Sequence, residues 1–578
     1  MLTRTSVYSK INLLSFAFIF LASSTNLYPQ SHQPLHSKNG MVVSASSYAS
    51  KVGIDILKKG GNAIDAAVAV GFTLAVTFPS AGNIGGGGFM VIHLANGKNV
   101  SIDFREKAPL SATKNMYLDE NGNYIEGSSL EGTTSAGVPG SVAGLIDALE
   151  NYGALSLEEV IQPAIDLAKN GWIMSEYDAK LFNKYAGEFI KYPSSAKIFL
   201  NNRELFKKGD VFKQPELAWT LQQIKEKGAD GFYQGKVAEL LINQIKSMGG
   251  SLTKDDLEKY DVKEREPVTG TYRGYKIVSM PPPSSGGIAL IEFLNILENY
   301  NISMNDWGSS KYIHHLAEAM KYVYADRTYD LGDDDFYPVP REGLISKQYA
   351  RSIYDKIEKY EDKAVPANEI KRGDPNKFVE SDQTTHYSVY DKFGNAVSTT
   401  TTINSTFGSK VVVEGAGFLL NNEMDDFSVK PGVPNQFGLL GSEANSIEPE
   451  KRMLSSMTPT IVLKDDKPYI VVGSPGGSKI ITTVLQVILN CIDFKMNIQQ
   501  AIDLPRIHDQ WYPDELYYER FAFSDDTYNI LEKMGYKFVN LTENDEFIGI
   551  AEGILIDNNK KTIYGASDPR GSGSVIGY

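Results

Sequence analysis

The stretch DQTTHYSVYDKFGNAVSTTTT occupies residues 382–402. Residues 384–390 are mostly β-branched or aromatic, which is typical of a strand, and residues 391–395 have the composition of a turn before a second strand at 396–402. The stretch therefore predicts a β-hairpin. The simplest interpretation of its six threonines is an ordinary threonine-rich hairpin in a half-buried sheet.

The pattern on both sides of this hairpin mixes strands with helices. Apolar periodicity predicts helices at residues 49–59, 63–76, 288–299 and 311–327, and strands at residues 40–45, 100–104, 275–280, 458–463, 468–472 and 549–555. The helix at 63–76 is almost entirely apolar, so we expect it to be buried on most sides. These elements predict a layered α/β fold in which helices cover stacked sheets. A chain of 578 residues also predicts several domains or one large intertwined domain.

Composition and charge exclude several classes of protein. The hydrophobic fraction of 42% is that of a globular protein with a sizeable core. The formal net charge is -14, and no run of lysine and arginine carries interleaved aromatic residues, so nucleic acid is not an expected partner. The single cysteine, Cys491, stands in an apolar run and is interpreted as a buried structural thiol.

The N-terminus has the layout of an export signal. Arg4 and Lys10 precede the apolar run INLLSFAFIFLA at residues 11–22, and small polar residues follow. This run is short for a bilayer span and predicts a signal peptide at residues 1–25, hence a periplasmic or secreted protein without a stable membrane span after signal removal. An uncleaved membrane anchor is the alternative.

Three familiar kinds of site are not indicated. GNIGGGGF at residues 82–89 does not fit the dinucleotide fingerprint and precedes a strand, so it predicts a tight turn with close backbone packing. No G-x-S-x-G elbow occurs in the chain. The adjacent pair His314 and His315 lacks zinc-helix spacing, and residues 333–335 lack the spacing of a calcium loop, so we expect no metal.

Four other motifs gather polar groups, each with two interpretations. Gly476 and Gly477 precede an apolar helix and form either a plain helix entry or an oxyanion site. NNEMDDFS at residues 421–428 is either a solvated acidic loop or an ammonium site. Ser455–Ser456 before a strand either cap a turn or donate to a ligand. Arg105 at a strand end either clamps a carboxylate or pairs with an acid such as Glu106.

Five motifs, taken in order, resemble the γ-glutamyltranspeptidase family of N-terminal nucleophile (Ntn) hydrolases. They are QTTHYSVYDKFGNAV, TINSTFGS, NNEMDDFS, KRMLSSM and SPGGSKIITTVLQ. The resemblance runs from residue 40 to GASDPR near the C-terminus. It implies an αββα sandwich of two antiparallel sheets covered by helices. It also implies a precursor that cuts itself between Gln383 and Thr384, giving an intertwined heterodimer of a large subunit (26–383) and a small catalytic subunit (384–578).

The resemblance implies that Thr384 is the nucleophile. Its hydroxyl needs a base, and a new α-amine with a reference pKa of about 7.7–8.0 supplies one on the same residue. No catalytic histidine is then needed, and His386 is interpreted as structural. Thr402 is expected to orient Thr384, and the N–H groups of Gly476 and Gly477 to hold the oxyanion.

The implied donor is a γ-glutamyl amide such as glutathione, passed to water or to an amino acid or short peptide without a cofactor. The resemblance implies that the α-carboxylate is bound by Arg105, Ser455 and Ser456. The α-ammonium is expected at Asn404, Glu423 and Asp426.

Two positions depart from the family pattern, and two other functions stay open. Glu423 stands where many bacterial members have glutamine, and Phe437, in an expected lid, stands where they usually have tyrosine; a phenyl ring cannot donate a hydrogen bond. The alternatives are a glutaryl or cephalosporin-type acylase of the same superfamily and an exported binding protein that stays uncut.

Overall fold

Two stacked antiparallel sheets form the centre of the fold. The computed structural model describes residues 32–201, 204–370, 384–430, 435–436, 438–544 and 546–578. The first sheet contains, in spatial order, β1 (Leu35–Ser37), β18 (Thr562–Ser567), β17 (Glu552–Asp557), β13 (Lys467–Gly473), β12 (Thr460–Lys464), β9 (Tyr275–Ser279) and β8 (Val268–Tyr272). The second contains β19 (Ser574–Gly577), β2 (Met41–Ser44), β10 (Thr385–Tyr390), β11 (Ala396–Thr402), β3 (Gly87–His93), β4 (Asn99–Asp103) and β7 (Lys263–Arg265).

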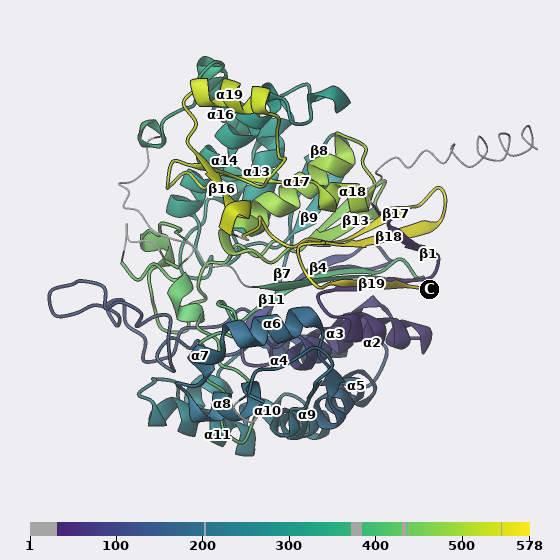
Figure 1. Cartoon of the computed structure of the whole chain (residues 1–578), viewed down its shortest axis with the longest axis vertical. Coiled ribbons are helices and arrows are strands. Elements are labelled where there is room, and N and C mark those ends of the chain that lie inside the picture. Colours follow the sequence, from purple (N-terminus) through teal and green to yellow (C-terminus); the bar gives the residue numbers. More distant parts are fainter. Residues whose placement is uncertain (1–31, 202–203, 371–383, 431–434, 437, 545) are drawn as a thin grey trace, which may run out of the picture. The chain divides into compact units, whose positions relative to one another are not determined.

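Helices cover the outer face of each sheet (Figure 1). On the second sheet, α2 (Ser47–Lys58), α3 (Ala63–Thr77) and α4 (Ser141–Tyr152) pack against the strands, and α5 (Leu157–Asn170) packs on α3. The helices α6 (Glu176–Lys184), α9 (Pro215–Lys227) and α11 (Gly235–Ser247) lie on the same side. The first sheet is covered by α13 (Gly286–Leu297), α14 (Ser310–Asp330), α16 (Lys347–Ile357), α17 (Ile480–Ile492) and α18 (Ile498–Asp503). The predicted layered α/β fold with two antiparallel sheets is confirmed.

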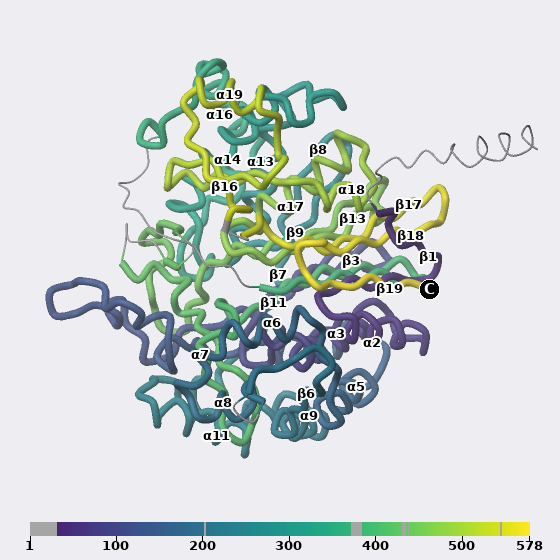
Figure 2. Tube along the Cα trace, viewed as in Figure 1, coloured from purple at the N-terminus to yellow at the C-terminus, as the bar shows by residue number. Residues whose placement is uncertain are grey.

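The second sheet is built from distant parts of the chain. β10 lies between β2 and β11, and β2 in turn pairs with the C-terminal strand β19. Figure 2 shows the yellow C-terminal segment in the same layer as green β11. Strands from both sides of residue 384 therefore hydrogen-bond within one sheet.

The predicted hairpin is confirmed as β10 and β11. Thr385 faces Thr401 and His386 faces Thr400 in an antiparallel register. Ser388 donates to the carbonyl of Glu552 over 3.1 Å and so ties the hairpin to the first sheet. The strand predicted at residues 549–555 was placed too early: β17 spans Glu552–Asp557, and Gly549, with a left-handed φ of 69°, belongs to the segment before it.

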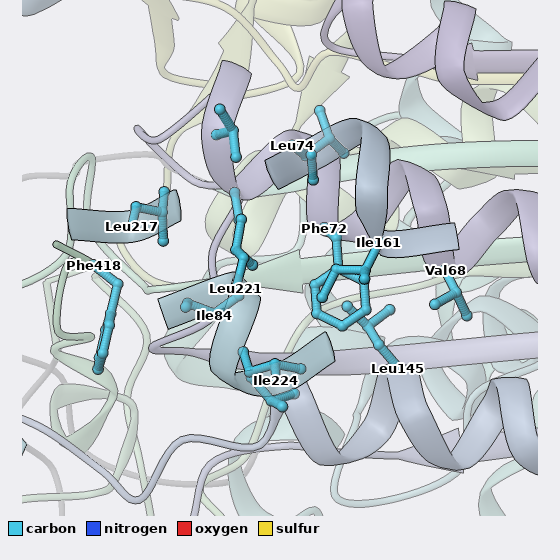
Figure 3. Packing of buried hydrophobic residues seen from close by; sticks show 14 of the residues in the cluster. Val68, Phe72, Leu74, Ile84, Leu145, Ile161, Leu217, Leu221, Ile224 and Phe418 are labelled. Carbon is cyan, nitrogen blue, oxygen red and sulfur yellow. The ribbon is translucent and has the colours of Figure 1, made fainter. Parts of the chain in front are cut away.

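Helix α3 is buried over its whole length, as its apolar sequence predicts. The Asn62 side chain caps its first turn, and the Asp65 carboxylate accepts a hydrogen bond from the Asn62 N–H. Figure 3 shows Val68 and Phe72 of α3 packed with Leu145 and Ile161 from the two following helices. This packing supports the helix-covered face of β10 and β11.

The glycines of the GNIGGGGF run let backbones approach closely, as predicted. An added Cβ at Gly86 would lie 2.1 Å from the Thr402 carbonyl oxygen, and one at Gly88 would lie 2.5 Å from that of Thr400. One at Gly85 would lie 2.1 Å from the Leu419 carbonyl oxygen. The run therefore presses against β11 with no space for side chains.

In the described part of the chain, no helix combines the length and apolarity that crossing a membrane requires. The signal peptide predicted at residues 1–25 lies outside the described residues. Cys491 is buried in α17, and burial raises the pKa of its thiol to about 12.

Replacing Gly86 with alanine is expected to destabilise the fold by about 1–3 kcal/mol, because the new methyl group meets backbone and not a flexible side chain. The control is Gly187→Ala, where no described atom outside its own helix backbone and chain neighbours lies within 4 Å of the added Cβ. Urea denaturation measures both. A Gly86→Ala protein as stable as the control would contradict the close-packing interpretation.

Candidate active site

Thr384 lies where two cavities meet. It immediately precedes β10 and is 6% exposed. A smaller cavity of about 30 Å³, here called the inner cavity, lies between β11 and the loop that carries Ser455 and Ser456. A larger cavity of about 290 Å³, here called the outer cavity, contains Gly476, Glu552 and Lys184 in its wall. Of the described residues, Thr384 alone lines both.

The inner cavity brings together most of the residues predicted from the sequence. Its wall includes Arg105, Thr384, Thr402, Asn404, Asp426, Ser455, Ser456 and Gly477. Gly476 lines the outer cavity, and Glu423 lies behind the wall against Arg105. Phe437, the expected lid residue, lies outside the described residues.

Arg105 is surrounded by carboxylates. Its guanidinium is 1% exposed, lies 2.6 Å from Glu423 and 3.4 Å from Glu106, and pairs with Asp426. Burial alone would lower the pKa of Arg105, but the charges of these acids outweigh it and raise that pKa. Of the two interpretations of Arg105, the structure shows the one in which it pairs with acids.

The three carboxyl groups around Arg105 are held in a low-dielectric environment. Burial raises the pKa of Glu106 to about 8, with Arg105 opposing the shift. Burial also raises the pKa values of Glu423 and Asp426, again against the opposing charge of Arg105. One guanidinium therefore lies against three carboxyl groups whose ionised forms are disfavoured by burial.

Arg327 is a cavity residue that the sequence analysis missed. It comes from α14, is 5% exposed and lines the inner cavity. It donates to the Ser285 hydroxyl over 3.0 Å and to the Ser456 hydroxyl over 2.9 Å. Among the described residues no carboxylate lies within ion-pair distance of it, and burial lowers its pKa. In the sequence it is indistinguishable from an exposed basic residue in a last helical turn.

The serine pair lies in the loop before β12, and the residue before α13 holds this loop in place. Ser285, just before α13, donates both its N–H and its hydroxyl to the Ser455 carbonyl, over 2.8 Å and 2.7 Å. The Ser455 hydroxyl accepts from the Met457 N–H over 3.1 Å. The hydroxyl thus caps a turn, as one interpretation of the pair predicts, and it also lines the inner cavity.

Thr402 and Asn404 occupy the opposite wall. The Thr402 hydroxyl accepts from the Asn404 N–H over 2.7 Å, and Asn404 adopts a left-handed φ of 70°. The Asn404 side chain donates to the Asn422 carbonyl over 2.9 Å. Strand β11 and the acidic loop are thereby locked to each other beside Thr384.

Gly476 and Gly477 form a turn before α17 with φ values of 136° and 52°. Among the described residues, neither glycine N–H donates to an acceptor. Two free N–H groups beside a helix N-terminus favour negative charge. This geometry fits the oxyanion interpretation.

His386 is fully buried and held between hydroxyl groups. Nδ1 lies 2.9 Å from the Thr400 hydroxyl and Nε2 lies 3.1 Å from that of Ser388. Burial lowers its pKa to about 3. A neutral ring with both nitrogens occupied fits a structural role. Within the described ranges, His, Cys, Asp and Glu side chains nowhere gather in a group of three able to hold a metal ion.

The family follows from comparison of the whole chain. The family model described as Gamma-glutamyltranspeptidase matches residues 49–578. The chain belongs to the gamma-glutamyltranspeptidase family. It is therefore an enzyme of the Ntn-hydrolase fold.

Known proteins resemble it over nearly their full length. The glutathione hydrolase proenzyme of Escherichia coli (strain K12) is 50% identical over 538 residues, covering 93% of this chain and 91% of that protein. A cephalosporin acylase structure from Bacillus halodurans has a TM-score of 0.82 at 27% identity, covering 96% of this chain and 98% of that chain. A Helicobacter pylori gamma-glutamyltranspeptidase structure has a TM-score of 0.54 at 52% identity, covering 57% of this chain and 92% of that chain.

The buried state of His386 predicts a specific acid sensitivity. Its folded-state pKa lies below the unfolded value of about 6.5, so its stabilising contribution is complete above that pH and is lost as the pH falls toward 3. Between about pH 7.5 and about pH 5, the wild-type protein should lose about 2 kcal/mol more unfolding free energy than His386→Gln. Urea unfolding at both pH values measures this. Equal losses would show that His386 is not held neutral.

Proposed function

We propose that the enzyme is a γ-glutamyltransferase and glutathione hydrolase in which Thr384 is the nucleophile. The observation that carries this proposal is the position of Thr384 at the start of a central strand, beside free N–H groups and a cavity lined by buried charges of both signs. The relatives' description as glutathione hydrolase proenzymes supports the substrate class.

The proposed first step is self-cleavage. The Thr384 hydroxyl attacks the Gln383 carbonyl, the peptide C–N bond breaks as an ester forms, and water then hydrolyses the ester. The products are a large fragment, 26–383, and a small fragment, 384–578, whose new terminus is the Thr384 α-amine. Because β2 of the first fragment hydrogen-bonds to β10 and β19 of the second, we expect the fragments to stay together as a heterodimer.

The inner cavity fits the two charges on the α-carbon of a γ-glutamyl group. Arg327 offers a buried positive charge that lacks an ion-pair partner among the described residues, and it holds Ser456 beside Ser455. Together with Arg105 these groups suit the α-carboxylate. Asn404 and the two acids that contact Arg105, Glu423 and Asp426, suit the α-ammonium. A ligand with both charges then leaves few buried groups unmatched.

The proposed acyl transfer uses the new terminus as base. The Thr384 α-amine takes the hydroxyl proton as Oγ attacks the γ-carbonyl, and the Gly476 and Gly477 N–H groups bind the oxyanion. The amine leaves with that proton, so a γ-glutamyl ester remains on Thr384. Water or an acceptor amine then attacks this ester and regenerates Thr384. Thr402, close to Asn404 and Thr384 in the cavity wall, is proposed to orient the nucleophile.

Export is proposed from the N-terminal segment. Residues 1–25 are expected to act as a signal peptide and to leave the mature protein in the periplasm or outside the cell.

A glutaryl or cephalosporin-type acylase is the second candidate, favoured by the similarity to the cephalosporin acylase fold. The charges of the inner cavity argue against it. A glutaryl group has a carboxylate but no ammonium, so it would bring a negative charge beside Glu423 and Asp426 without the positive charge that offsets it.

We expect the γ-glutamyl anilide to exceed both the glutaryl anilide and the 4-aminobutanoyl anilide by about 100-fold or more in kcat/KM, because each analogue lacks one charge. Arg327→Gln should raise the KM for the γ-glutamyl and glutaryl anilides, which carry a carboxylate. The KM for the 4-aminobutanoyl anilide should stay unchanged. Initial rates of anilide release measure all three.

Arg351→Gln, an exposed change on α16, is the matched control. Faster turnover of the glutaryl than of the γ-glutamyl anilide would favour the acylase instead. A uniform loss for all three substrates in Arg327→Gln would remove Arg327 from the carboxylate site.

A further inference from the structure

The proposed binding of the γ-glutamyl group uses the inner cavity and leaves the outer cavity without a ligand. The inner cavity accounts for the charges of that group, and Thr384 is its boundary with the outer cavity. A donor whose γ-carbonyl lies at Thr384 therefore directs its scissile C–N bond toward the outer cavity. The amine side of the reaction needs space there, and about 290 Å³ is much more than a water molecule requires.

Two buried polar groups in the outer cavity lack partners. Thr385 Oγ1 and Glu552 Oε2 make no hydrogen bond to described residues, although each side chain is only 1% exposed. The other Glu552 oxygen accepts from the Ser567 hydroxyl over 3.0 Å. Buried polar atoms in native proteins are normally satisfied, so these two point to a polar ligand. Burial also raises the pKa of Glu552 well above its ordinary value.

The charges that face the outer cavity have an uneven arrangement. Lys184, at the end of α6, is its single basic residue among those described and has no carboxylate within ion-pair distance. Its exposed side chain lies at the mouth. Glu546 is also exposed there, and Glu552 lies in the interior. The rings of His386, Tyr177 and Tyr185 also line the wall, and burial, which lowers the pKa of His386, holds that imidazole neutral.

We propose that the outer cavity binds the amine partner of the reaction as a short peptide, with its N-terminal amine at Thr384 and its C-terminal carboxylate at Lys184. Thr385 and Glu552 supply hydrogen-bond partners along it. The same site holds the peptide that leaves from a peptide-bearing donor. This inference rests on the proposed transferase activity and adds to it the location and charge preference of the acceptor.

The test compares acceptors with and without a carboxylate. With γ-glutamyl anilide as donor, KM is measured for glycylglycine and for glycylglycine amide in the wild type, Lys184→Gln and Lys180→Gln. Lys180 lies on the same helix, is exposed and does not line the cavity. Lys184→Gln should raise the ratio of the glycylglycine KM to the amide KM by about two- to fivefold, the size of an exposed ion pair. Lys180→Gln should leave the ratio as in the wild type.

Thr385→Val provides a second, independent measurement. The hydroxyl it removes has no hydrogen-bond partner among the described residues, so thermal stability should not fall. The KM for both acceptors should nevertheless rise several-fold because a hydrogen bond to the bound peptide is lost. A lower Tm with unchanged acceptor KM would assign Thr385 a structural role only.

The outcomes separate this inference from the proposed function. A wild-type protein that releases no anilide and transfers no γ-glutamyl group would overturn the proposed function itself. If the wild type is active but the ratio of the glycylglycine KM to the amide KM is the same in Lys184→Gln, the proposed function stands. The assignment of the acceptor carboxylate to Lys184 is then overturned.

Discussion

The pairing of β10 with β11 is the constraint on which the site depends. This register fixes the position of Thr384, the residue before β10, relative to Thr402 at the end of β11. Close glycine contacts hold β11 on one side, and the link from Ser388 to Glu552 holds β10 against the first sheet. Because β2 lies on the other edge of β10, cleavage before Thr384 would free a terminus without freeing the strand. A nucleophile on a fixed strand needs little reorganisation to react.

The second constraint is electrostatic. Arg105 is buried with three acids, whereas Arg327 is buried with two hydroxyl groups and has no carboxylate in ion-pair distance among the described residues. Isolated buried charges are costly, so this uneven arrangement is expected where a charged ligand completes the set. A zwitterionic γ-glutamyl group supplies both signs. Under the proposed function, the sheets provide the geometry and the buried charge of Arg327 contributes to the selectivity.

Local patterns in the sequence predict the hairpin, the buried helix α3 and the glycine turn, because each depends on neighbouring residues and burial. The αββα arrangement and the roles around Thr384 came instead from the family resemblance. Arg327 was missed because its partner Ser456 lies 129 residues away, and nothing in a helix sequence marks such a contact. Likewise, no local pattern shows that Arg105 is already paired, or that Lys184 and Glu552, hundreds of residues apart, line one cavity.

The central claim is that Thr384 becomes an N-terminus. Purified, exported protein is denatured, its fragments are separated, and the smaller fragment is analysed by intact mass and N-terminal sequencing. The account predicts two fragments, the smaller one beginning at Thr384, and a single uncut chain for Thr384→Ala. A folded wild-type protein that hydrolyses γ-glutamyl anilide as one uncut chain, or whose small fragment begins at another residue, would contradict it.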